Sequence, residues 1–144
     1  MNKAKNVLLI EDGPHDQFFF IQALKEIPNA ALCDVAINGR EALSKLENCA
    51  TLPDLIFTDI HMPVMDGIEF LSEMIKSSRI KDIPVVVLSS DSGHIEMVRK
   101  LGARAFIKKT CDFGLLQKEL EQMINEDFED ELDPQPFQTM LSPF

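Results

Sequence analysis

The sequence predicts an α/β fold in which a doubly wound, five-stranded parallel sheet is covered by helices on both faces. Short apolar runs alternate with amphipathic stretches five times along the chain, as expected for successive βα units. The apolar runs are continuous rather than alternating, which is typical of parallel strands that are buried on both faces. The 144 residues have the length of one domain, which is large enough to bury a core without disulfides or metals.

The first two βα units occupy the amino-terminal third of the chain. The first begins with the apolar run Val7–Ile10, after which Gly13 and Pro14 open a helix, since proline is tolerated in a first turn. The second starts with a weaker strand near Leu32–Ile37 and continues through Gly39 into a helix. The apolar residues expected to face the core are Ile21, Leu24 and Ile27 in the first helix and Ala42, Leu43 and Leu46 in the second.

The three remaining units follow the same pattern. Their predicted strands are Leu55–Phe57, Val85–Leu88 and Ala105–Ile107. Each strand precedes a helix whose apolar residues recur about one turn apart. These residues are Ile68, Leu71 and Ile75; Ile95, Val98 and Leu101; and Leu116, Leu120, Met123 and Ile124. Because strand–helix–strand crossovers are right-handed, the five strands are expected to form one parallel sheet.

Residues 126–144 break this pattern, and we divide the chain into a domain of residues 1–125 and an acidic, proline-containing tail of residues 126–144. Six acidic residues lie between Glu126 and Asp133, and without them 18 acids face 14 bases. The net charge of −10 therefore falls mainly on the tail. Its phenylalanines, among them Phe128 and Phe137, are expected to pack on the domain or on a second copy, which would make a homodimer.

Composition excludes several classes of function. No cluster of Lys and Arg offers a surface for nucleic acid. No apolar run is long enough for membrane insertion, and the amino terminus lacks the apolar stretch of a signal peptide. Cys33, Cys49 and Cys111 cannot all pair and form no C-x-x-C motif. They are expected to be free thiols of a cytoplasmic protein.

Chemically active side chains stand where the predicted strands end. The set is Glu11 and Asp12 after the first strand, Asp59 after the third, Ser89 at the fourth and Lys108 at the fifth. In an open parallel sheet, ligands bind outside these carboxyl ends. Three neighbouring carboxylates repel one another, and an oxygen-only ligand set favours a hard divalent cation such as Mg²⁺.

This combination of groups suits phosphoryl transfer. The transferred group spreads its charge over three equatorial oxygens, and Mg²⁺, an ammonium and a hydroxyl can each stabilise one of them. Asp59 can act as the nucleophile, since a carboxylate is already ionised at neutral pH and forms an aspartyl phosphate.

The sequence resembles response-regulator receiver domains of the CheY type from about Asn6 to Ile124. The motifs that carry the resemblance are Val-Leu-Leu-Ile-Glu-Asp (7–12), Asp-Leu-Ile-Phe-Thr-Asp-Ile-His-Met-Pro-Val-Met-Asp-Gly (54–67), Pro-Val-Val-Val-Leu-Ser-Ser (84–90) and Gly-Ala-Arg-Ala-Phe-Ile-Lys-Lys (102–109). It implies the flavodoxin-like strand order 2-1-3-4-5. The Glu-Asp-x-Pro-x-Asp pattern at residues 11–16 is similar to that of small single-domain regulators partnered with phytochrome-type kinases.

The resemblance assigns a role to each matching position. Asp59 would be the phosphoacceptor. Asp12 would bind Mg²⁺ directly and Glu11 through water, and the backbone carbonyl of His61 would be a further ligand. Ser89 would hydrogen-bond the phosphoryl group, and Lys108 would form an ion pair with it. Phe106 would change rotamer when Ser89 moves toward the phosphoryl group.

One position departs from the family pattern. The family usually has a proline after the lysine, commonly with a cis peptide bond, and this sequence has Lys109 there. A cis bond before a non-proline residue costs about 3–4 kcal/mol, so a trans bond with a reshaped loop, or a strained bond, is expected. The two positions that tune dephosphorylation in the family are occupied by His61 and Asp91.

The sequence thus predicts a single-domain response regulator, not an enzyme, that accepts a phosphoryl group from a sensor histidine kinase or a histidine phosphotransfer protein. It would signal by protein contact or relay through its fourth helix, fifth strand and fifth helix. The alternatives are a phosphorylation-independent adaptor, a hydrolase of the haloacid-dehalogenase type and a flavin carrier. The hydrolase needs an aspartate where His61 stands, and the acidic loop at residues 11–16 would repel a flavin phosphate.

Overall fold

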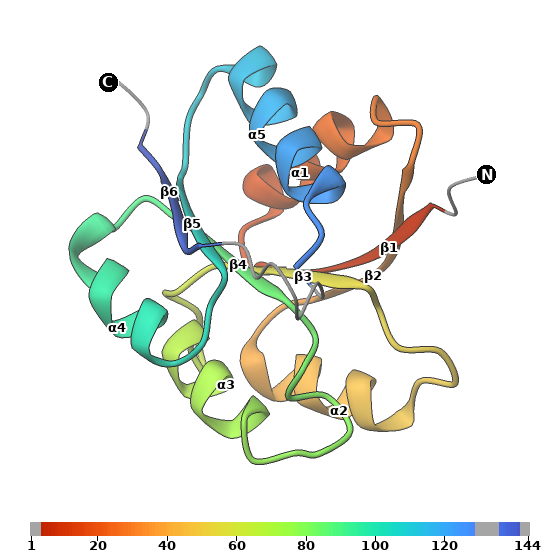
Figure 1. The fold of residues 1–144 in the computed structure, drawn as a ribbon, viewed down its shortest axis with the longest axis vertical. Helices are drawn as coiled ribbons and strands as arrows, with labels where there is room; N and C mark the ends of the chain where they lie inside the picture. Colours follow the sequence, from red (N-terminus) through yellow and green to blue (C-terminus); the bar gives the residue numbers. More distant parts are fainter. Residues whose placement is uncertain (1–3, 129–135, 142–144) are drawn as a thin grey trace.

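The computed structural model describes residues 4–128 and 136–141 and shows one parallel sheet between two layers of helices (Figure 1). The strands are β1 (Lys5–Ile10), β2 (Ala30–Ala36), β3 (Leu55–Thr58), β4 (Val85–Ser89), β5 (Ala105–Lys108) and β6 (Gln138–Met140). The helices are α1 (Pro14–Lys25), α2 (Gly39–Asn48), α3 (Gly67–Met74), the 3₁₀ helix η1 (Ser92–His94), α4 (Ile95–Lys100) and α5 (Phe113–Asn125).

The strand order is β2-β1-β3-β4-β5-β6, which confirms the predicted order of the first five strands and adds a sixth. Helices α1 and α5 cover one face of the sheet, and α2, α3 and α4 cover the other (Figure 1). Every strand pair is parallel. The carboxyl ends of all the described strands therefore lie at one edge of the sheet.

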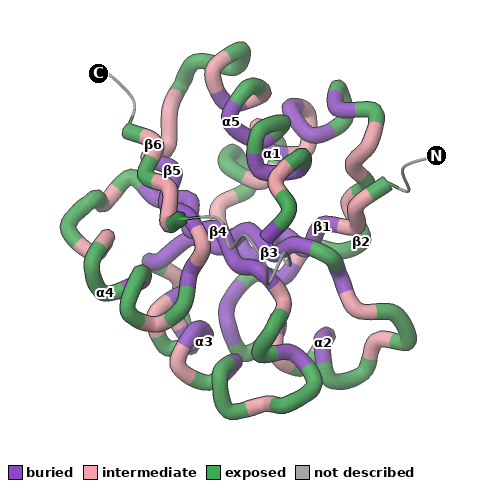
Figure 2. Tube along the Cα trace, in the orientation of Figure 1, coloured by how far each residue is buried: buried purple, intermediate pink, exposed green. Residues whose placement is uncertain are grey.

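Two apolar clusters hold the layers together, and alternate residues of each strand contribute to one or the other. Leu9, Phe57 and Ile107 pack with α1 and α5, and Phe20 meets Phe57 with ring centroids 5.1 Å apart. Leu8, Ile56 and Phe106 are among the strand residues that pack toward α2, α3 and α4. Burial follows the strands through the centre of the molecule (Figure 2), and the continuous apolar runs are thus explained by a sheet covered on both faces.

The helix boundaries explain one wrong prediction about the core. Ile75 was expected to face inward, but its side chain is 52% exposed because α3 ends at Met74. Asp66 begins that helix with a capping box, in which its side chain accepts from the backbone N–H of Glu69 and Glu69 reaches back to the Asp66 N–H.

The described part of the tail packs on its own chain. Phe128 is buried in the cluster beneath α1 and α5, and Phe137 packs against the other cluster. Residues Gln138–Met140 form β6, which lies beside β5 at the edge of the sheet (Figure 1). The packing of these phenylalanines within one chain removes the reason to assign them to a dimer contact, and the homodimer stays a prediction. Residues 129–135, which hold four of the six tail acids, lie outside the described part of the chain.

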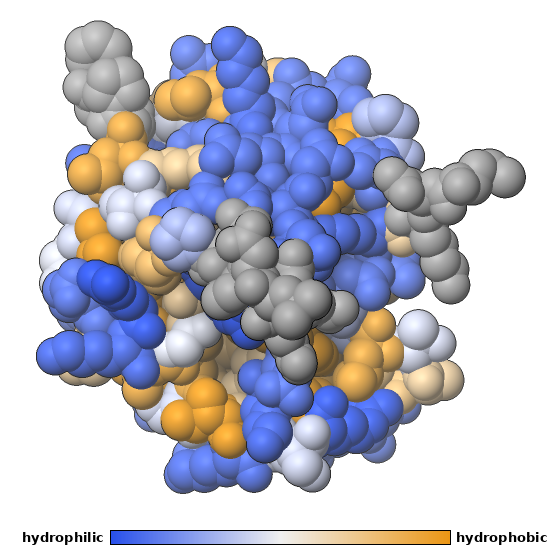
Figure 3. Space-filling model, viewed as in Figure 1, coloured by the Kyte–Doolittle hydropathy of each residue, from blue (hydrophilic) through white to orange (hydrophobic). Residues whose placement is uncertain are grey.

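The outer surface over α5 is mainly hydrophilic, and the hydrophobic residues visible on this face form separate patches (Figure 3). Within the described residues, no helix combines the length and the apolar character needed to cross a bilayer. The three cysteines are all unpaired, as predicted.

Candidate functional site

Glu11, Asp59 and Lys109 meet at the carboxyl edge of the sheet. Strands β1 and β3 pair with Ile10 opposite Thr58, so the residues that follow them are neighbours. The Asp59 backbone N–H donates to the Ile10 carbonyl at 3.0 Å. On the other side, the Lys109 N–H donates to the Ser89 carbonyl at 3.0 Å, which ties the end of β5 to the end of β4.

The Lys109 ammonium contacts three carboxylates at once. Its Nζ lies 2.8 Å from Asp59 Oδ2, 2.8 Å from Glu11 Oε1 and 2.7 Å from Asp16 Oδ2. Asp16 comes from the first turn of α1, which begins directly after the loop that carries Glu11. Glu11 and Asp59 are buried, with 3% and 8% of their surface exposed, while the Asp16 side chain is half exposed. Lys109 therefore joins two buried acids and one surface acid.

The Asp59 carboxylate is fixed by its own loop. Its Oδ1 accepts the Ile60 backbone N–H at 2.7 Å, which leaves Oδ2 for Lys109. The loop is held in turn by Gly67, whose N–H donates to the Ile60 carbonyl at 2.7 Å. A Cβ at Gly67 would lie 2.2 Å from the Asp59 carbonyl oxygen, so only glycine permits this approach of α3 to the site.

The charges of the site do not balance. Three carboxylates face one ammonium, and burial raises the pKa of Glu11 although the hydrogen bonds from Lys109 and Gly13 oppose this. Burial would lower the pKa of Lys109, but the hydrogen bonds to Asp16, Asp59 and Glu11 outweigh it and raise that pKa. Lys109 is thus held in its charged form, and a net negative charge remains to attract a cation.

The donor set fits a hard divalent cation. Glu11, Asp16 and Asp59 each offer a carboxylate oxygen, and these atoms lie within 4.8 Å of one another. Oxygen-only ligands suit Mg²⁺, which binds through one or two carboxylates and keeps several waters. The sequence prediction named Asp12, but its side chain is exposed and the structure brings Asp16 into the cluster instead. A role for Asp12 as an ion ligand stays a prediction.

The lysine that contacts Asp59 is Lys109. The prediction that Lys108 would take this position is wrong in this structure. Strand β5 continues through Lys108, which pairs with Ser89 and follows Phe106 on the α4 side of the sheet. Lys109 is the first residue beyond the strand, and its side chain reaches the acidic cluster. Two consecutive lysines made the assignment depend on a shift of one residue, which reverses the face on which a strand residue lies.

With Lys109 as the lysine that contacts Asp59, the residue that departs from the family pattern is Thr110, which stands where the family usually has proline. The Thr110 hydroxyl accepts the backbone N–H of Asp112 at 3.0 Å, and the Asp112 side chain caps α5 by accepting from Leu115 at 3.1 Å. The peptide bonds described by the structure include no cis bond. The loop after β5 is therefore closed by side-chain hydrogen bonds that lead into α5.

The other predicted residues surround this cluster at different depths. Ser89 is fully buried, and its hydroxyl accepts the Asp91 backbone N–H at 3.1 Å. Phe106 is fully buried in the cluster on the α4 side. The His61 side chain is 61% exposed and contacts Asp91. Roles for Ser89, Phe106 and the His61 carbonyl in binding or switching stay predictions.

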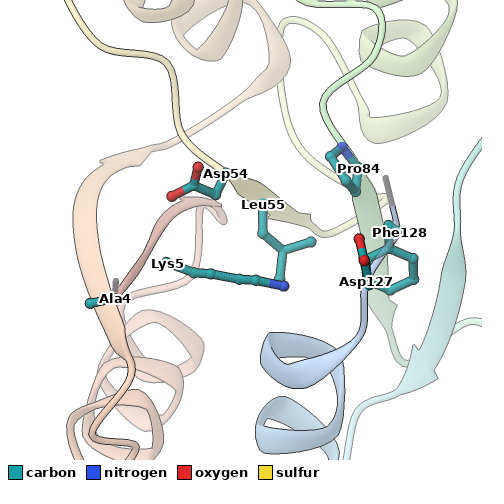
Figure 4. Close-up of a pocket in the computed structure, with 7 residues that line it drawn as sticks. All are labelled: Ala4, Lys5, Asp54, Leu55, Pro84, Asp127 and Phe128. Atoms are coloured by element: carbon teal, nitrogen blue, oxygen red, sulfur yellow. The ribbon is translucent and has the colours of Figure 1, made fainter. Parts of the chain in front are cut away.

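A separate pocket of about 180 Å³ lies at the other edge of the sheet (Figure 4). It is bordered by Lys5, Leu55 and Pro84, which stand near the amino ends of their strands, and by Phe128. The Lys5 ammonium donates to the backbone carbonyl of Glu126 at 2.6 Å. The pocket thus lies far along the strands from the acidic cluster, under the start of the tail.

Residues 7–121 match the family described as the response regulator receiver domain. The chain belongs to this family. A protein-glutamate methylesterase/protein-glutamine glutaminase of Treponema denticola is 42% identical over 107 residues, which cover 72% of this chain and 28% of that protein. The sensor histidine kinase CheAY of Helicobacter pylori is 38% identical over 94 residues, which cover 61% of this chain and 12% of the kinase. The match therefore spans less than a third of the length of each of these two relatives.

Solved structures of receiver proteins share the fold. A phosphorylated cyanobacterial phytochrome response regulator, RcpA, superimposes with a TM-score of 0.73 at 28% identity. The superposition covers 83% of this chain and 91% of the RcpA chain. The Mn²⁺-bound response regulator Rcp1 gives a TM-score of 0.73 at 25% identity, with 91% and 99% covered. The chain is thus a receiver domain of two-component signalling.

Proposed function

We propose that this receiver domain accepts a phosphoryl group on Asp59 and acts as a phosphorylation-driven switch. The observation that carries the proposal is a buried carboxylate whose Oδ2 lies 2.8 Å from an ammonium, beside two further carboxylates. The phosphoryl donor would be a sensor histidine kinase or a histidine phosphotransfer protein. In this proposal the chain is a phosphoacceptor rather than an enzyme.

The residues of the site divide the chemistry between them. A carboxylate oxygen of Asp59 forms a bond to phosphorus as the phosphorus–nitrogen bond of the donor phosphohistidine breaks. The Lys109 ammonium contacts Asp59 Oδ2 and can stabilise the negative charge of the phosphoryl oxygens once they are bound to this carboxylate. The Ile60 N–H keeps the carboxylate in one orientation during the transfer.

A divalent cation would be held by Glu11, Asp16 and Asp59 once the Lys109 ammonium, which contacts the same three carboxylates in this structure, moves onto the phosphoryl oxygens, and Asp12 is near enough in sequence to contribute. Its charge would stabilise the phosphoryl oxygens when bound. Receiver domains typically bind Mg²⁺, and the solved Rcp1 structure contains Mn²⁺. The proposal of Mg²⁺ as the cofactor rests on this likeness and on the oxygen-only ligand set.

Phosphorylation would be transmitted through Ser89. Its hydroxyl accepts from Asp91 in this structure, and a phosphoryl group of charge near −2 on Asp59 would offer it a stronger acceptor. Phe106 is buried on the α4 side of the neighbouring strand and would repack with it. The surface that changes would comprise α4, β5 and α5, and β6 lies along the β5 edge of that surface.

The test uses a small phosphodonor, because the kinase partner is unidentified. Acetyl phosphate with Mg²⁺ should add one phosphoryl group per chain to the wild type, measured as the intact mass. The Asp59→Asn variant keeps the shape of the side chain and should gain none. Stoichiometric labelling of Asp59→Asn would refute the acceptor assignment, and a wild type without labelling would favour the phosphorylation-independent adaptor.

A further inference from the structure

His61, Asp91 and His94 form a second cluster of ligand-type side chains beside the acidic one. His61 lies in the loop after β3, Asp91 follows β4, and His94 ends η1. Because β3 and β4 are adjacent parallel strands, their following loops meet at the same edge of the sheet. The His61 and His94 rings lie 5.6 Å apart, edge to face.

Both imidazoles point at one carboxylate oxygen. His61 Nε2 lies 2.8 Å from Asp91 Oδ2, and His94 Nε2 lies 3.2 Å from the same atom. The three ligand atoms of this cluster are all within 4.8 Å of one another. A metal with bonds of about 2.0–2.2 Å to nitrogen and oxygen in tetrahedral geometry requires ligand separations of roughly 3.3 Å. The two nitrogen–oxygen separations, 2.8 and 3.2 Å, lie within about 0.5 Å of that spacing.

The Asp91 carboxylate is already oriented by the backbone. Its Oδ1 accepts the Gly93 N–H at 2.9 Å, and its own N–H donates to the Ser89 hydroxyl at 3.1 Å. The Gly93 bond fixes one carboxylate oxygen, the Ser89 bond holds the Asp91 backbone, and the second carboxylate oxygen faces the two histidines. Such hydrogen bonds to a ligating carboxylate raise metal affinity, because the ligand loses little freedom on binding. The hydrogen bond with His61 also keeps the pKa of Asp91 below its ordinary value.

We propose that His61, Asp91 and His94 bind a divalent transition metal ion of the Zn²⁺ class. Two imidazole nitrogens and one carboxylate oxygen suit Zn²⁺ and its neighbours in the first transition row, whereas Mg²⁺ prefers oxygen ligands alone. The side chains are 61%, 41% and 39% exposed, so the ion can enter from solvent and keep water as a further ligand. The ion would clamp the loops after β3 and β4 together.

This site differs from the acidic cluster in chemistry and in residues. The acidic cluster offers carboxylate oxygens from Glu11, Asp16 and Asp59, and the proposed site shares none of them. Metal binding here does not depend on phosphorylation of Asp59, so it can be tested whether or not the proposed function holds. Its position matters for signalling, since His61 stands two residues after Asp59 and Asp91 is bonded to Ser89.

The test is calorimetric titration of the untagged full chain with Zn²⁺ in excess Mg²⁺, which keeps the acidic cluster supplied with its own ion. One Zn²⁺ per chain should bind, and His61→Ala and His94→Ala should each weaken binding at least roughly tenfold. His15→Ala is the matched control, because His15 is the remaining histidine of the sequence and lies on α1. It should bind like the wild type, and so should Asp59→Asn.

Three results would overturn the proposal. The first is the absence of Zn²⁺ binding at millimolar concentration. The second is equal affinity in the wild type, His61→Ala and His94→Ala, which would place the ion on the cysteines or the acids. The third is loss of binding in Asp59→Asn. Circular dichroism of each variant checks the fold, and a Co²⁺ spectrum without a thiolate charge-transfer band would support imidazole and carboxylate ligands.

Discussion

Replacement of Lys109 by Gln should destabilise the folded state and slow phosphorylation, because it leaves three carboxylates without their shared cation. Removing one partner of a buried ion pair costs about 3–5 kcal/mol. The Lys109 side chain is 19% exposed, and its contact with the half-exposed Asp16 adds little. We therefore expect a loss of about 2–3 kcal/mol in the free energy of unfolding without Mg²⁺.

The assay is urea unfolding followed by circular dichroism, with and without Mg²⁺. For a urea slope of about 2 kcal/mol per molar, the midpoint of Lys109→Gln should fall by roughly 1–1.5 M. Millimolar Mg²⁺ should restore part of this loss, because a cation that binds only the folded state stabilises it by mass action. Labelling by acetyl phosphate should slow at least roughly tenfold, since the ammonium no longer stabilises the phosphoryl oxygens.

Lys108→Gln is the matched control, since it removes the same charge one residue earlier. Lys108 lies outside the acidic cluster, so this change should alter the unfolding free energy by less than about 1 kcal/mol. It should leave the labelling rate close to that of the wild type. An equal or larger effect of Lys108→Gln on either quantity would refute the assignment of Lys109 as the site lysine.

Three further substitutions test other parts of the account. Gly67→Ala should destabilise the fold by roughly 2 kcal/mol and slow labelling of Asp59, because the new Cβ would press on the loop backbone; urea unfolding and intact mass measure both effects. Phe128→Ala should lower the free energy of unfolding, measured by thermal unfolding, by about 3 kcal/mol, because Phe128 is only 6% exposed and packs in the core under α1 and α5. Glu119 is buried in α5 with one unpartnered oxygen, and burial raises its pKa from 4.5 to about 7. At Glu119 the folded state then binds more protons than the unfolded state between these pH values, so the contribution of Glu119 to stability is most favourable below about pH 4.5 and falls as pH rises toward 7. Glu119→Gln should remove this fall and stabilise the protein by up to about 3 kcal/mol in urea unfolding at pH 8.

Each of these predictions has a contrary result. An unchanged labelling rate in Gly67→Ala would show that the loop tolerates a side chain. A Phe128→Ala variant as stable as the wild type would mean that the start of the tail does not belong to the core. A stability gain in Glu119→Gln that is the same at pH 4 and pH 8 would exclude titration of Glu119 as its cause.

The five βα units were predictable because buried parallel strands need continuous apolar runs, and Val7–Ile10 and Val85–Leu88 are such runs. The sixth strand was not. Residues Gln138–Met140 form only three strand positions after a proline-containing segment, and no apolar run marks them. They gain their conformation from pairing with the free edge of β5, which is a tertiary contact that the local sequence does not encode.

The acidic site was predictable in kind but not in every residue. Glu11 and Asp59 follow unmistakable strands, so their meeting at one sheet edge follows from parallel topology. The choice between Lys108 and Lys109 depends on the last residue of β5, and strand ends are the least certain feature of a sequence prediction. Asp16 reaches the site only because α1 begins at Pro14, and the Glu-Asp-x-Pro-x-Asp pattern was the available signal for it.

The histidine cluster shows a further limit of sequence analysis. His61 has no second histidine four residues away, and the spacing to His94 has no pattern typical of a metal site. The two residues meet because the loops after adjacent strands converge, and Asp91 orients them. Only the arrangement of β3 beside β4 brings these ligand atoms together.

The most direct test of the central claim locates the phosphoryl group on the chain. Borohydride reduces an aspartyl phosphate to homoserine, and peptide mass spectrometry then identifies the modified residue. After reaction with acetyl phosphate and Mg²⁺, the modification should appear at Asp59 alone and should be lost when Mg²⁺ is chelated. Modification at Asp12, Asp16 or another carboxylate, with Asp59 intact, would contradict the account.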